Sequence, residues 1–372
     1  MSQKLHILFL SSWYPSKTLP TQGDFVQRHA EAVATKHQVS VVHVVSDVNL
    51  NHVNITDETI NNVRTIIAYI PQKNTLLKLF LFFKLYRSII KKIGFYNMVH
   101  LNITFSKGLV ALYLKIVKRK KYIISEHWTG YHPIKNKSIG SVEKFLTKWI
   151  TKNATFICPV SNNLRDSMIN FGLKGNYFRV PNVVDISNFN SAPIPEIFTI
   201  THISHMGNNH KNIKGILNVI SSLQSKIPQL HFNLIGDDSK KYKPLIEKLN
   251  ISNISIIDQI SSKEVAEYLK NSSVFILFSN YENLPCVILE SFACGVPVVS
   301  TNVGGINEFF PNNFGYLIKQ KDEKNLRKSI LKIYNSELDF DKTAMHSYAV
   351  ENFSINEICN QFSNLYYKVL SN

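Results

Sequence analysis

The sequence predicts an α/β protein made of two doubly wound domains. Two observations lead to this fold class. Short, all-apolar segments, which are typical of buried parallel strands, alternate with helical stretches in both halves of the chain. A stretch of low periodicity with three prolines, residues 181–195, separates the halves and is predicted to be a linker. A length of 372 residues with 44% hydrophobic content is enough for two such cores.

The first domain is predicted to extend from residue 1 to 185. Its expected strands are Leu5–Leu10, Val39–Val45, Met98–Asn102, Tyr122–Glu126 and Thr155–Cys158. The loop after the first strand contains Trp13, and Gly23 and Asp24 open the next helix. Because this loop follows the carboxyl end of a strand, these residues are placed to line a crevice, although an ordinary surface loop explains them equally well. There is no GxGxxG, so the dinucleotide fingerprint is absent.

The second domain, residues 186–354, contains the segment with the strongest functional signal. A buried strand, Val274–Phe278, is followed by a polar loop and by a helix from about Pro285 to Cys294. Proline is expected at the first helical position, and Gly295 is expected to end the helix. A second buried strand follows at Val298–Ser300. Ligands bind at the carboxyl ends of the strands in such open sheets.

Two carboxylates flank the start of this helix. Glu282 lies in the preceding loop, and Glu290 follows eight positions later, in the second turn. The free amides at the helix start can bind a phosphate. A carboxylate near a sugar ring, amides for a diphosphate and a carboxylate for ribose hydroxyls would together suit a nucleotide sugar. The alternative is that both glutamates are simply solvated, and spacing alone favours that alternative.

The residues around this pair make the functional interpretation specific. Glu-x7-Glu is followed by Ala293-x-Gly295-x-Pro297-Val-Val and then by Gly304-Gly305-x-x-Glu308. This combination strongly resembles retaining GT-B glycosyltransferases of family 4. The resemblance implies two facing Rossmann-like domains, with a final helix, from about residue 355 to 372, that crosses back to the first.

The resemblance also implies roles for individual residues. Glu290 would hold the donor ribose, Glu282 would lie beside the transferred sugar, and Gly304-Gly305 would line the same pocket. Lys211, in a Lys-Asn-x-x-Gly segment, matches the residue that binds the diphosphate, and His127 matches a histidine that contacts the donor sugar. The further donor-site candidates are Asn283, Leu284, Pro285, Gly207 and Lys214.

The sequence departs from the family pattern at two places. Asn283 stands where many members have a glycine after the first glutamate. The arginine that usually precedes the lysine by about five residues is replaced by Met206-Gly207-Asn208. Lys214, His210 or a basic residue of the first domain would have to compensate, or donor binding would be weaker.

No metal and no cofactor are expected. The single DxD, Asp339-Phe340-Asp341, lies outside the strand-end loops and is interpreted as surface. The expected activity is therefore metal-independent hexosyl transfer from a UDP- or GDP-linked sugar to a saccharide acceptor. Two alternatives stay open: a nucleotide-sugar epimerase of the same fold, and an inactive module that binds a sugar nucleotide or glycan.

Charge indicates where an anionic partner would bind. Residues 1–186 hold 25 of the 42 basic residues and 9 of the 26 acidic ones, so this half carries the whole net charge of +16. The segment Thr75–Ile93 combines basic residues with Leu and Phe, which suits an anionic membrane surface. A core helix with a solvated basic edge is an equal alternative. The apolar bulk of the segment counts against nucleic acid.

These observations lead to an expected location. No run is long and uncharged enough to span a bilayer, and the four cysteines lack metal or CxxC spacing, which suits a reducing cytosol. We expect a cytoplasmic protein, peripheral on the inner face of the membrane, with a lipid-linked saccharide of a bacterial surface glycan as acceptor.

Overall fold

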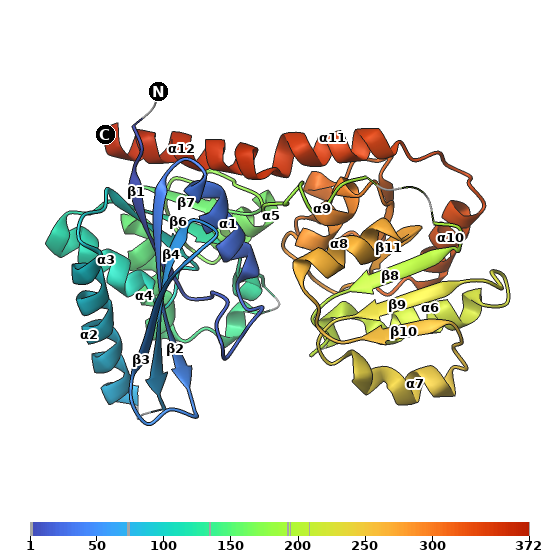
Figure 1. Cartoon of the computed structure of the whole chain (residues 1–372), viewed down its shortest axis with the longest axis horizontal. Helices are drawn as coiled ribbons and strands as arrows, with labels where there is room; N and C mark the ends of the chain where they lie inside the picture. Colours follow the sequence, from blue (N-terminus) through green and yellow to red (C-terminus); the bar gives the residue numbers. More distant parts are fainter. Residues whose placement is uncertain are drawn as a thin grey trace. The chain divides into compact units, whose positions relative to one another are not determined.

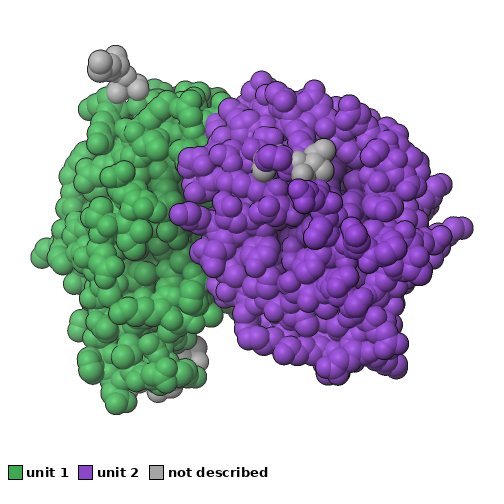
Figure 2. All heavy atoms as spheres, turned by 45° about the vertical axis from the view of Figure 1, so that its right-hand side comes forward, with its two compact units in different colours: residues 1–183, 355–372 green, residues 184–354 purple. Residues whose placement is uncertain are grey.

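The computed structural model describes residues 3–72, 75–133, 135–191, 193, 195–207 and 209–371, without the side chains of residues 75, 76 and 79. The chain forms two compact units (Figure 2). Unit 1 comprises Met1–Val183 and Ile355–Asn372, and unit 2 comprises Val184–Ser354. The expected boundaries, 185 and 354, lie within two residues of these.

Unit 1 is built on a seven-stranded sheet with the order β3-β4-β2-β1-β5-β6-β7 (Figure 1). All neighbours are parallel except β3 and β4. The strands are β1 (His6–Ser11), β2 (Gln38–Asp47), β3 (Asn54–Ile60), β4 (Val63–Pro71), β5 (Met98–Asn102), β6 (Tyr122–Glu126) and β7 (Phe156–Pro159). The five predicted strands are all present, because each contains a largely apolar run that is buried.

The hairpin of β3 and β4 was not predicted. β3 has the sequence NITDETI and is exposed along nearly its whole length, so it lacks the apolar run that identified the other strands. It pairs antiparallel with β4 at the edge of the sheet. An edge strand with one solvated face gives a weak sequence signal.

The helices of unit 1 connect the parallel strands. They are α1 (Asp24–Ala34), α2 (Thr75–Ile93), α3 (Gly108–Lys118), α4 (Ser141–Asn153), α5 (Asn162–Asn170) and α12 (Ile355–Ser371), with short 3-10 turns η1 (Thr129–Tyr131) and η2 (Asn136–Ser138). The strand order reverses direction between β1 and β5. Right-handed connections therefore place α1 on one face of the sheet and α3 and α4 on the other. Loops after β1 and β5 meet at this switch point.

The last helix, α12, belongs to unit 1, as predicted, and packs against α1. Buried histidines help to hold it there. His100 bonds through Nδ1 to the Tyr366 hydroxyl at 2.6 Å, and His37 bonds through Nε2 to the Ser363 hydroxyl at 2.9 Å. Phe362 packs edge-on against the ring of His29. The return of the chain to unit 1 is thus fixed by apolar packing and by polar bonds in the interior.

Unit 2 is built on a six-stranded parallel sheet with the order β10-β9-β8-β11-β12-β13. The strands are β8 (Thr199–Ile203), β9 (His231–Ile235), β10 (Ile254–Ile257), β11 (Val274–Leu277), β12 (Val298–Thr301) and β13 (Gly315–Ile318). The helices are α6 (Ile213–Leu223), α7 (Lys243–Lys248), α8 (Ser262–Lys270), α9 (Cys286–Ala293), α10 (Glu323–Tyr334) and α11 (Lys342–Phe353), and the 3-10 turns are η3 (Asn209–Lys211), η4 (Ser239–Tyr242) and η5 (Ile306–Phe309).

The strand order of unit 2 reverses between β8 and β11. From β8 the chain moves one way to β9 and β10, and from β11 it moves the other way to β12 and β13. The loops that follow β8 and β11 therefore leave adjacent strands in opposite directions. This switch point is where open α/β sheets bind their ligands.

One detail of the predicted helix in this region was wrong. Pro285 is not the first helical residue. It is the extended residue that precedes the helix, with φ −70° and ψ 121°, and α9 begins at Cys286. The fixed φ of proline suits both positions, so the sequence does not separate them. Gly295 follows the end of the helix with a left-handed φ of +70°, as expected of a helix terminator.

Within the described residues, no helix is long and apolar enough to cross a membrane.

Candidate functional site

The candidate donor site lies at the switch point of unit 2. It is formed by the loop after β8, the loop after β11 and the turn after β12. These segments carry Lys211, Glu282 and the pair Gly304-Gly305. They are far apart in the sequence, but parallel strands bring their carboxyl ends to one edge of the sheet.

The structure joins the two most important candidates in an ion pair. Lys211 Nζ lies 2.5 Å from Glu282 Oε1, and only 12% and 10% of the two side chains are exposed. Opposite charges that are largely removed from water and hydrogen-bonded hold each other in place. Sequence reasoning assigned the two residues separate roles and did not predict this contact. Their separation of 71 positions gives no local signal for it.

The loops that carry the pair are bonded to each other along their backbones. Asn280 N donates to the His210 carbonyl at 2.6 Å, and its side-chain amide donates to the Asn209 carbonyl at 3.2 Å. The rings of His210 and Tyr281 stack with centroids 4.9 Å apart. His210, which was a candidate for replacing the missing arginine, is thus part of the contact between these two loops.

Gly304 is required at its position because of close backbone packing. Its φ is +59°, and a Cβ built there would lie 1.8 Å from the carbonyl oxygen of Glu282. Gly305 N donates to the Asn283 carbonyl at 2.9 Å. The glycine pair therefore supports the backbone that carries Glu282, which is a positioning role in the structure.

The start of α9 follows directly after Glu282. Asn283 and Leu284 are buried, at 7% and 5% exposure, and Pro285 precedes the first helical amides. Glu290 lies in the second turn of α9 and is buried, with 1% exposure. The sequence led us to expect this carboxylate on a crevice; in the structure it has almost no solvent exposure and lies one turn before Cys294. Burial, and after it the charge of Glu290, raises the pKa of the Cys294 thiol to about 12.

The loop after β8 contains the other donor-site candidates. Gly207 is exposed, and a Cβ there would lie 2.6 Å from the His205 ring. Lys214 is exposed in the first turn of α6. Of the segment that replaces the family's arginine, Asn208 lies outside the described residues. Lys241, which sequence reasoning did not consider, donates from η4 to the Met206 carbonyl, so a cation contacts this segment.

His202 lies near the end of β8, where the charges of both Lys211 and Glu282 act on it, and was missed by the sequence analysis. Its Nδ1 donates to the Ile276 carbonyl at 2.8 Å, and its Nε2 accepts from the Ser204 hydroxyl at 2.7 Å. Burial lowers the pKa of His202 to about 4, with a smaller contribution from the charge of Lys211. A neutral imidazole thus fills the interior beside the site. The one sequence feature that could have identified His202 as a site residue is its position near the end of a predicted strand.

The acceptor-side loop of unit 1 also depends on a glycine. Gly23 has φ +81°, and a Cβ there would lie 2.5 Å from the backbone of Trp13. The Trp13 ring packs edge-on against Phe25 with centroids 6.2 Å apart, and Asp24 pairs with Arg28 at 3.5 Å. Trp13, Gly23 and Asp24 are therefore brought together, at the carboxyl end of β1.

His127 follows β6, and its neighbour Glu126 organises the loop. Glu126 is buried and accepts four hydrogen bonds: from Thr104 N at 3.0 Å, Thr104 Oγ1 at 2.6 Å, His127 N at 3.0 Å and Trp128 N at 2.9 Å. The ring of His127 packs on Phe25 at 4.3 Å. Burial lowers the pKa of His127 well below its ordinary value, so the ring is neutral. Glu126 was missed because a carboxylate at the end of a strand resembles a solvated residue.

The acidic DxD segment has a structural role at one end. Asp341 accepts from Ala344 N at 2.9 Å and caps α11. Among the described residues, no three His, Cys, Asp or Glu side chains are grouped in a way that could hold a metal ion.

Comparison with known families supports a single assignment for both units. Residues 22–188 match the family described as Glycosyltransferase Family 4, and residues 187–351 match Glycosyl transferases group 1. The two matches together span most of the chain.

Three curated relatives are of this kind. An uncharacterized glycosyltransferase of Methanocaldococcus jannaschii is 25% identical over 68% of this chain and 70% of its own length. The N-acetyl-alpha-D-glucosaminyl L-malate synthase of Bacillus anthracis is 27% identical over 46% of this chain and 45% of its own length. A putative teichuronic acid biosynthesis glycosyltransferase of Bacillus subtilis, TuaC, is 29% identical over 34% of this chain and 31% of its own length. The chain thus spans less than half the length of the last two relatives.

Solved structures show the same fold over nearly the whole chain. The sucrose-phosphate synthase of Thermosynechococcus elongatus has a TM-score of 0.81 at 19% identity and covers 99% of this chain and 100% of its own. Anabaena HepE, solved with UDP-glucose, has a TM-score of 0.74 at 14% identity and covers 98% of this chain and 100% of its own. The largely parallel sheets of both units, the returning helix and both family matches lead to one conclusion: the chain belongs to the GT-B glycosyltransferases, with the family 4 and group 1 segments in succession.

Proposed function

We propose that this protein is a metal-independent, retaining hexosyltransferase that uses a nucleotide-diphosphate sugar as donor and a saccharide as acceptor. The observation that carries the proposal is the buried ion pair of Lys211 and Glu282 at the switch point of unit 2, directly before the start of α9. When the bond between the sugar and the diphosphate breaks, negative charge develops on the diphosphate and positive charge on the sugar. A cation and an anion held side by side can stabilise these two charges, respectively.

Lys211 would stabilise the departing diphosphate. An ammonium group has three N–H donors, and the bond to Glu282 uses one of them. The remaining donors, together with the first amides of α9, are available to phosphate oxygens. Because Lys211 is already fixed by its partner, little reorganisation is needed when the negative charge moves onto the leaving group.

Glu282 would stabilise the positive charge on the sugar. Its backbone is held by the packing of Gly304 and by the bond from Gly305 to Asn283, so the carboxylate is positioned before the donor binds. A preorganised charge of this kind acts on the oxocarbenium-like state more strongly than a mobile one. Glu290 would bind the ribose hydroxyls, with Leu284, Pro285, Gly207 and Lys214 beside the donor.

The relatives support the choice of substrates. HepE was solved with UDP-glucose, so we propose a UDP- or GDP-linked sugar as donor. TuaC is named for teichuronic acid biosynthesis, and on that basis we propose a lipid-linked saccharide of a bacterial surface glycan as acceptor. The acceptor residues would be Trp13, Gly23 and Asp24 of unit 1, and His127 would bind a hydroxyl of the transferred sugar. The enzyme would be cytoplasmic and bound to the anionic face of the membrane.

An inactive sugar-nucleotide-binding module is the second candidate. The specific observation that favours it is the absence of an arginine from the loop after β8, where the family usually supplies a second cation for the diphosphate. Binding without turnover would support this candidate.

Calorimetric titration with UDP, GDP and UMP tests the donor site without knowledge of the acceptor. Lys211→Ala should weaken binding of the preferred diphosphate by about tenfold or more, and should affect the monophosphate less. Lys226→Ala, three residues beyond the far end of α6, removes the same charge from an exposed position and serves as the matched control. Equal affinities for wild type and Lys211→Ala would refute the assignment of Lys211.

A further inference from the structure

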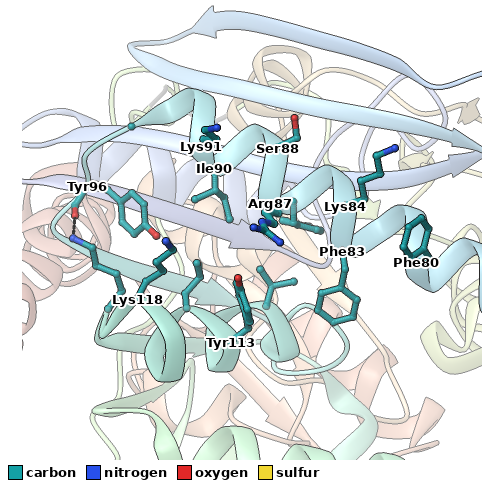
Figure 3. A pocket seen from close by; sticks show the side chains of 15 residues that line it. Phe80, Phe83, Lys84, Arg87, Ser88, Ile90, Lys91, Tyr96, Tyr113 and Lys118 are labelled. Carbon is teal, nitrogen blue, oxygen red and sulfur yellow. Dashed lines mark hydrogen bonds between the residues drawn. The ribbon is translucent and has the colours of Figure 1, made fainter.

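A groove with a volume of about 1090 Å³ lies between α2 and α3 of unit 1 (Figure 3). The donor-site residues do not take part in it. Phe80 and Phe83 lie at one end, and Lys118 and Tyr96 lie at the other. Arg87 points into the space between the two helices, toward Tyr113. The groove thus carries its two phenylalanines, with Lys84, at one end, and most of its basic side chains from its middle to the other end.

This polarity follows from the sequence of α2. Phe80, Phe83, Arg87 and Lys91 succeed one another at spacings of three or four residues, so they share one face of the helix. From Phe80 to Lys91 the helix rises about 16 Å, at about 1.5 Å per residue. On α3, Tyr113 and Leu114 are followed one turn later by Lys118, so the second wall changes from apolar to basic in the same direction.

The exposed phenylalanines of the groove are additional to the side chains that hold the helix on the sheet. Phe82, Leu85 and Ile89 are buried and do not line the groove, whereas Tyr86 and Ile90 are buried and do line it. Phe80 and Phe83 are 66% and 39% exposed. Large apolar side chains gathered at one exposed place indicate an interaction site, since single-domain surfaces rarely leave them uncovered. Both alternatives from the sequence therefore apply: α2 is a core helix on one face and a candidate binding surface on another.

The basic side chains of the groove lack a counter-ion among the residues that the structure describes. Neither α2 nor α3 contains an acidic residue. Lys92, on the other side of α2, pairs with Asp57 at 3.0 Å, whereas within the described part of the chain Arg87, Lys91 and Lys118 are exposed and have no ion pair. An external anion would complete this cluster.

We propose that the groove binds one anionic phospholipid of a bilayer. The phosphate would lie among Arg87, Lys91 and Lys118, and an acyl chain would extend along Phe80 and Phe83. The length of about 16 Å is close to half of the roughly 30 Å hydrocarbon thickness of a bilayer, which is one leaflet. The basic side chains are complementary to a lipid phosphate, and the exposed phenylalanines are complementary to an acyl chain. Nucleic acid would bind the basic side chains but would leave the phenylalanines without a partner. This proposal deepens the membrane binding included in the proposed function, but it does not depend on sugar transfer.

Sedimentation with vesicles tests the charged end of the groove. The full chain should bind vesicles that contain phosphatidylglycerol and should not bind phosphatidylcholine alone, and high salt should weaken the binding. Arg87→Gln combined with Lys118→Gln should weaken it by about 30-fold, since each cation near an anionic surface contributes about fivefold. Lys324→Gln combined with Lys328→Gln, on exposed positions of α10, removes the same charge and should leave binding unchanged.

A tryptophan reporter tests the end of the groove that carries the phenylalanines. It distinguishes an acyl chain bound in the groove from nonspecific adsorption of the protein to the membrane surface. Phe83→Trp should be quenched strongly by phosphatidylglycerol with brominated chains. Ile116→Trp, on the part of α3 outside the groove, should be quenched less.

Several results would overturn the proposal. One is an equal loss of vesicle binding in the groove charge variant and in the α10 control variant. Another is equal quenching of the Phe83→Trp and Ile116→Trp reporters. A third is binding of duplex DNA or RNA in place of vesicles. Transfer to a soluble acceptor is measured in the groove variants as well. A groove variant that loses vesicle binding but keeps its transfer rate would support the lipid site independently of the proposed function. Absence of transfer in the wild type would refute the proposed function and would leave the lipid proposal standing.

Discussion

Replacement of Gly304 by alanine should disable the donor site without touching any proposed catalytic group. The added Cβ would lie 1.8 Å from the Glu282 carbonyl oxygen, and the nearest comfortable distance for such a contact is about 3.3 Å. The loop would therefore have to move by roughly 1.5 Å. A displacement of about 1 Å can cost about a hundredfold in rate, so we expect kcat to fall at least by that factor. The left-handed φ of +59° adds about 1–2 kcal/mol of backbone strain.

The assay is transfer from a labelled nucleotide sugar, measured together with the free energy of unfolding. Gly172→Ala is the matched control, because Gly172 also has a left-handed φ, of +92°, but a Cβ there would meet only the flexible end of Lys148. Gly172→Ala carries the backbone strain without the clash, so it should lose some stability and keep its turnover, whereas Gly304→Ala should lose more stability and also lose turnover. A Gly304→Ala enzyme with a wild-type rate would refute the argument that this glycine positions Glu282.

Three further predictions concern the glutamates, metal and pH. Glu290→Ala should chiefly weaken nucleotide binding, while Glu282→Ala should chiefly lower turnover, by about ten- to a thousandfold. Wild-type transfer rates in both variants would refute the assignment of these glutamates to the site. Activity should survive EDTA, because Lys211 supplies the positive charge; complete loss on chelation, restored by Mn²⁺ or Mg²⁺, would contradict this. Burial lowers the pKa of His29, His43 and His202 to about 4, so these rings stay neutral in the folded protein while the unfolded chain takes up protons below about pH 6.5. The free energy of unfolding should therefore fall as the pH drops from about 6.5 toward 4, by about 1.4 kcal/mol per pH unit for each histidine. Urea unfolding at several pH values measures this, and a free energy of unfolding that does not change over this range would contradict the prediction.

Most of the fold could be predicted because buried parallel strands have a strong signature. The run Val274–Leu277 is apolar throughout, Met98–Asn102 is largely apolar, and both are buried throughout in the structure. The β3 hairpin was not predicted, because an exposed edge strand needs no apolar run.

The candidate site was only partly accessible from the sequence. The motif around Glu282 and Glu290 indicated which residues to consider, but their surroundings depend on packing between distant segments. The bond between Lys211 and Glu282, the contact of Gly304 with the Glu282 backbone and the burial of Glu290 all depend on how strands align at the sheet edge. No local pattern encodes these distances.

The central claim is that the site of unit 2 transfers a sugar, and product analysis after incubation with labelled UDP- and GDP-sugars and a saccharide acceptor tests it most directly. The account predicts release of the nucleoside diphosphate and a labelled glycoside whose anomeric configuration is that of the donor. It also predicts that Glu282→Ala slows both by the same factor. An isomerised nucleotide sugar would indicate an epimerase, and bound but unchanged donor would indicate a binding module; either result would contradict the account.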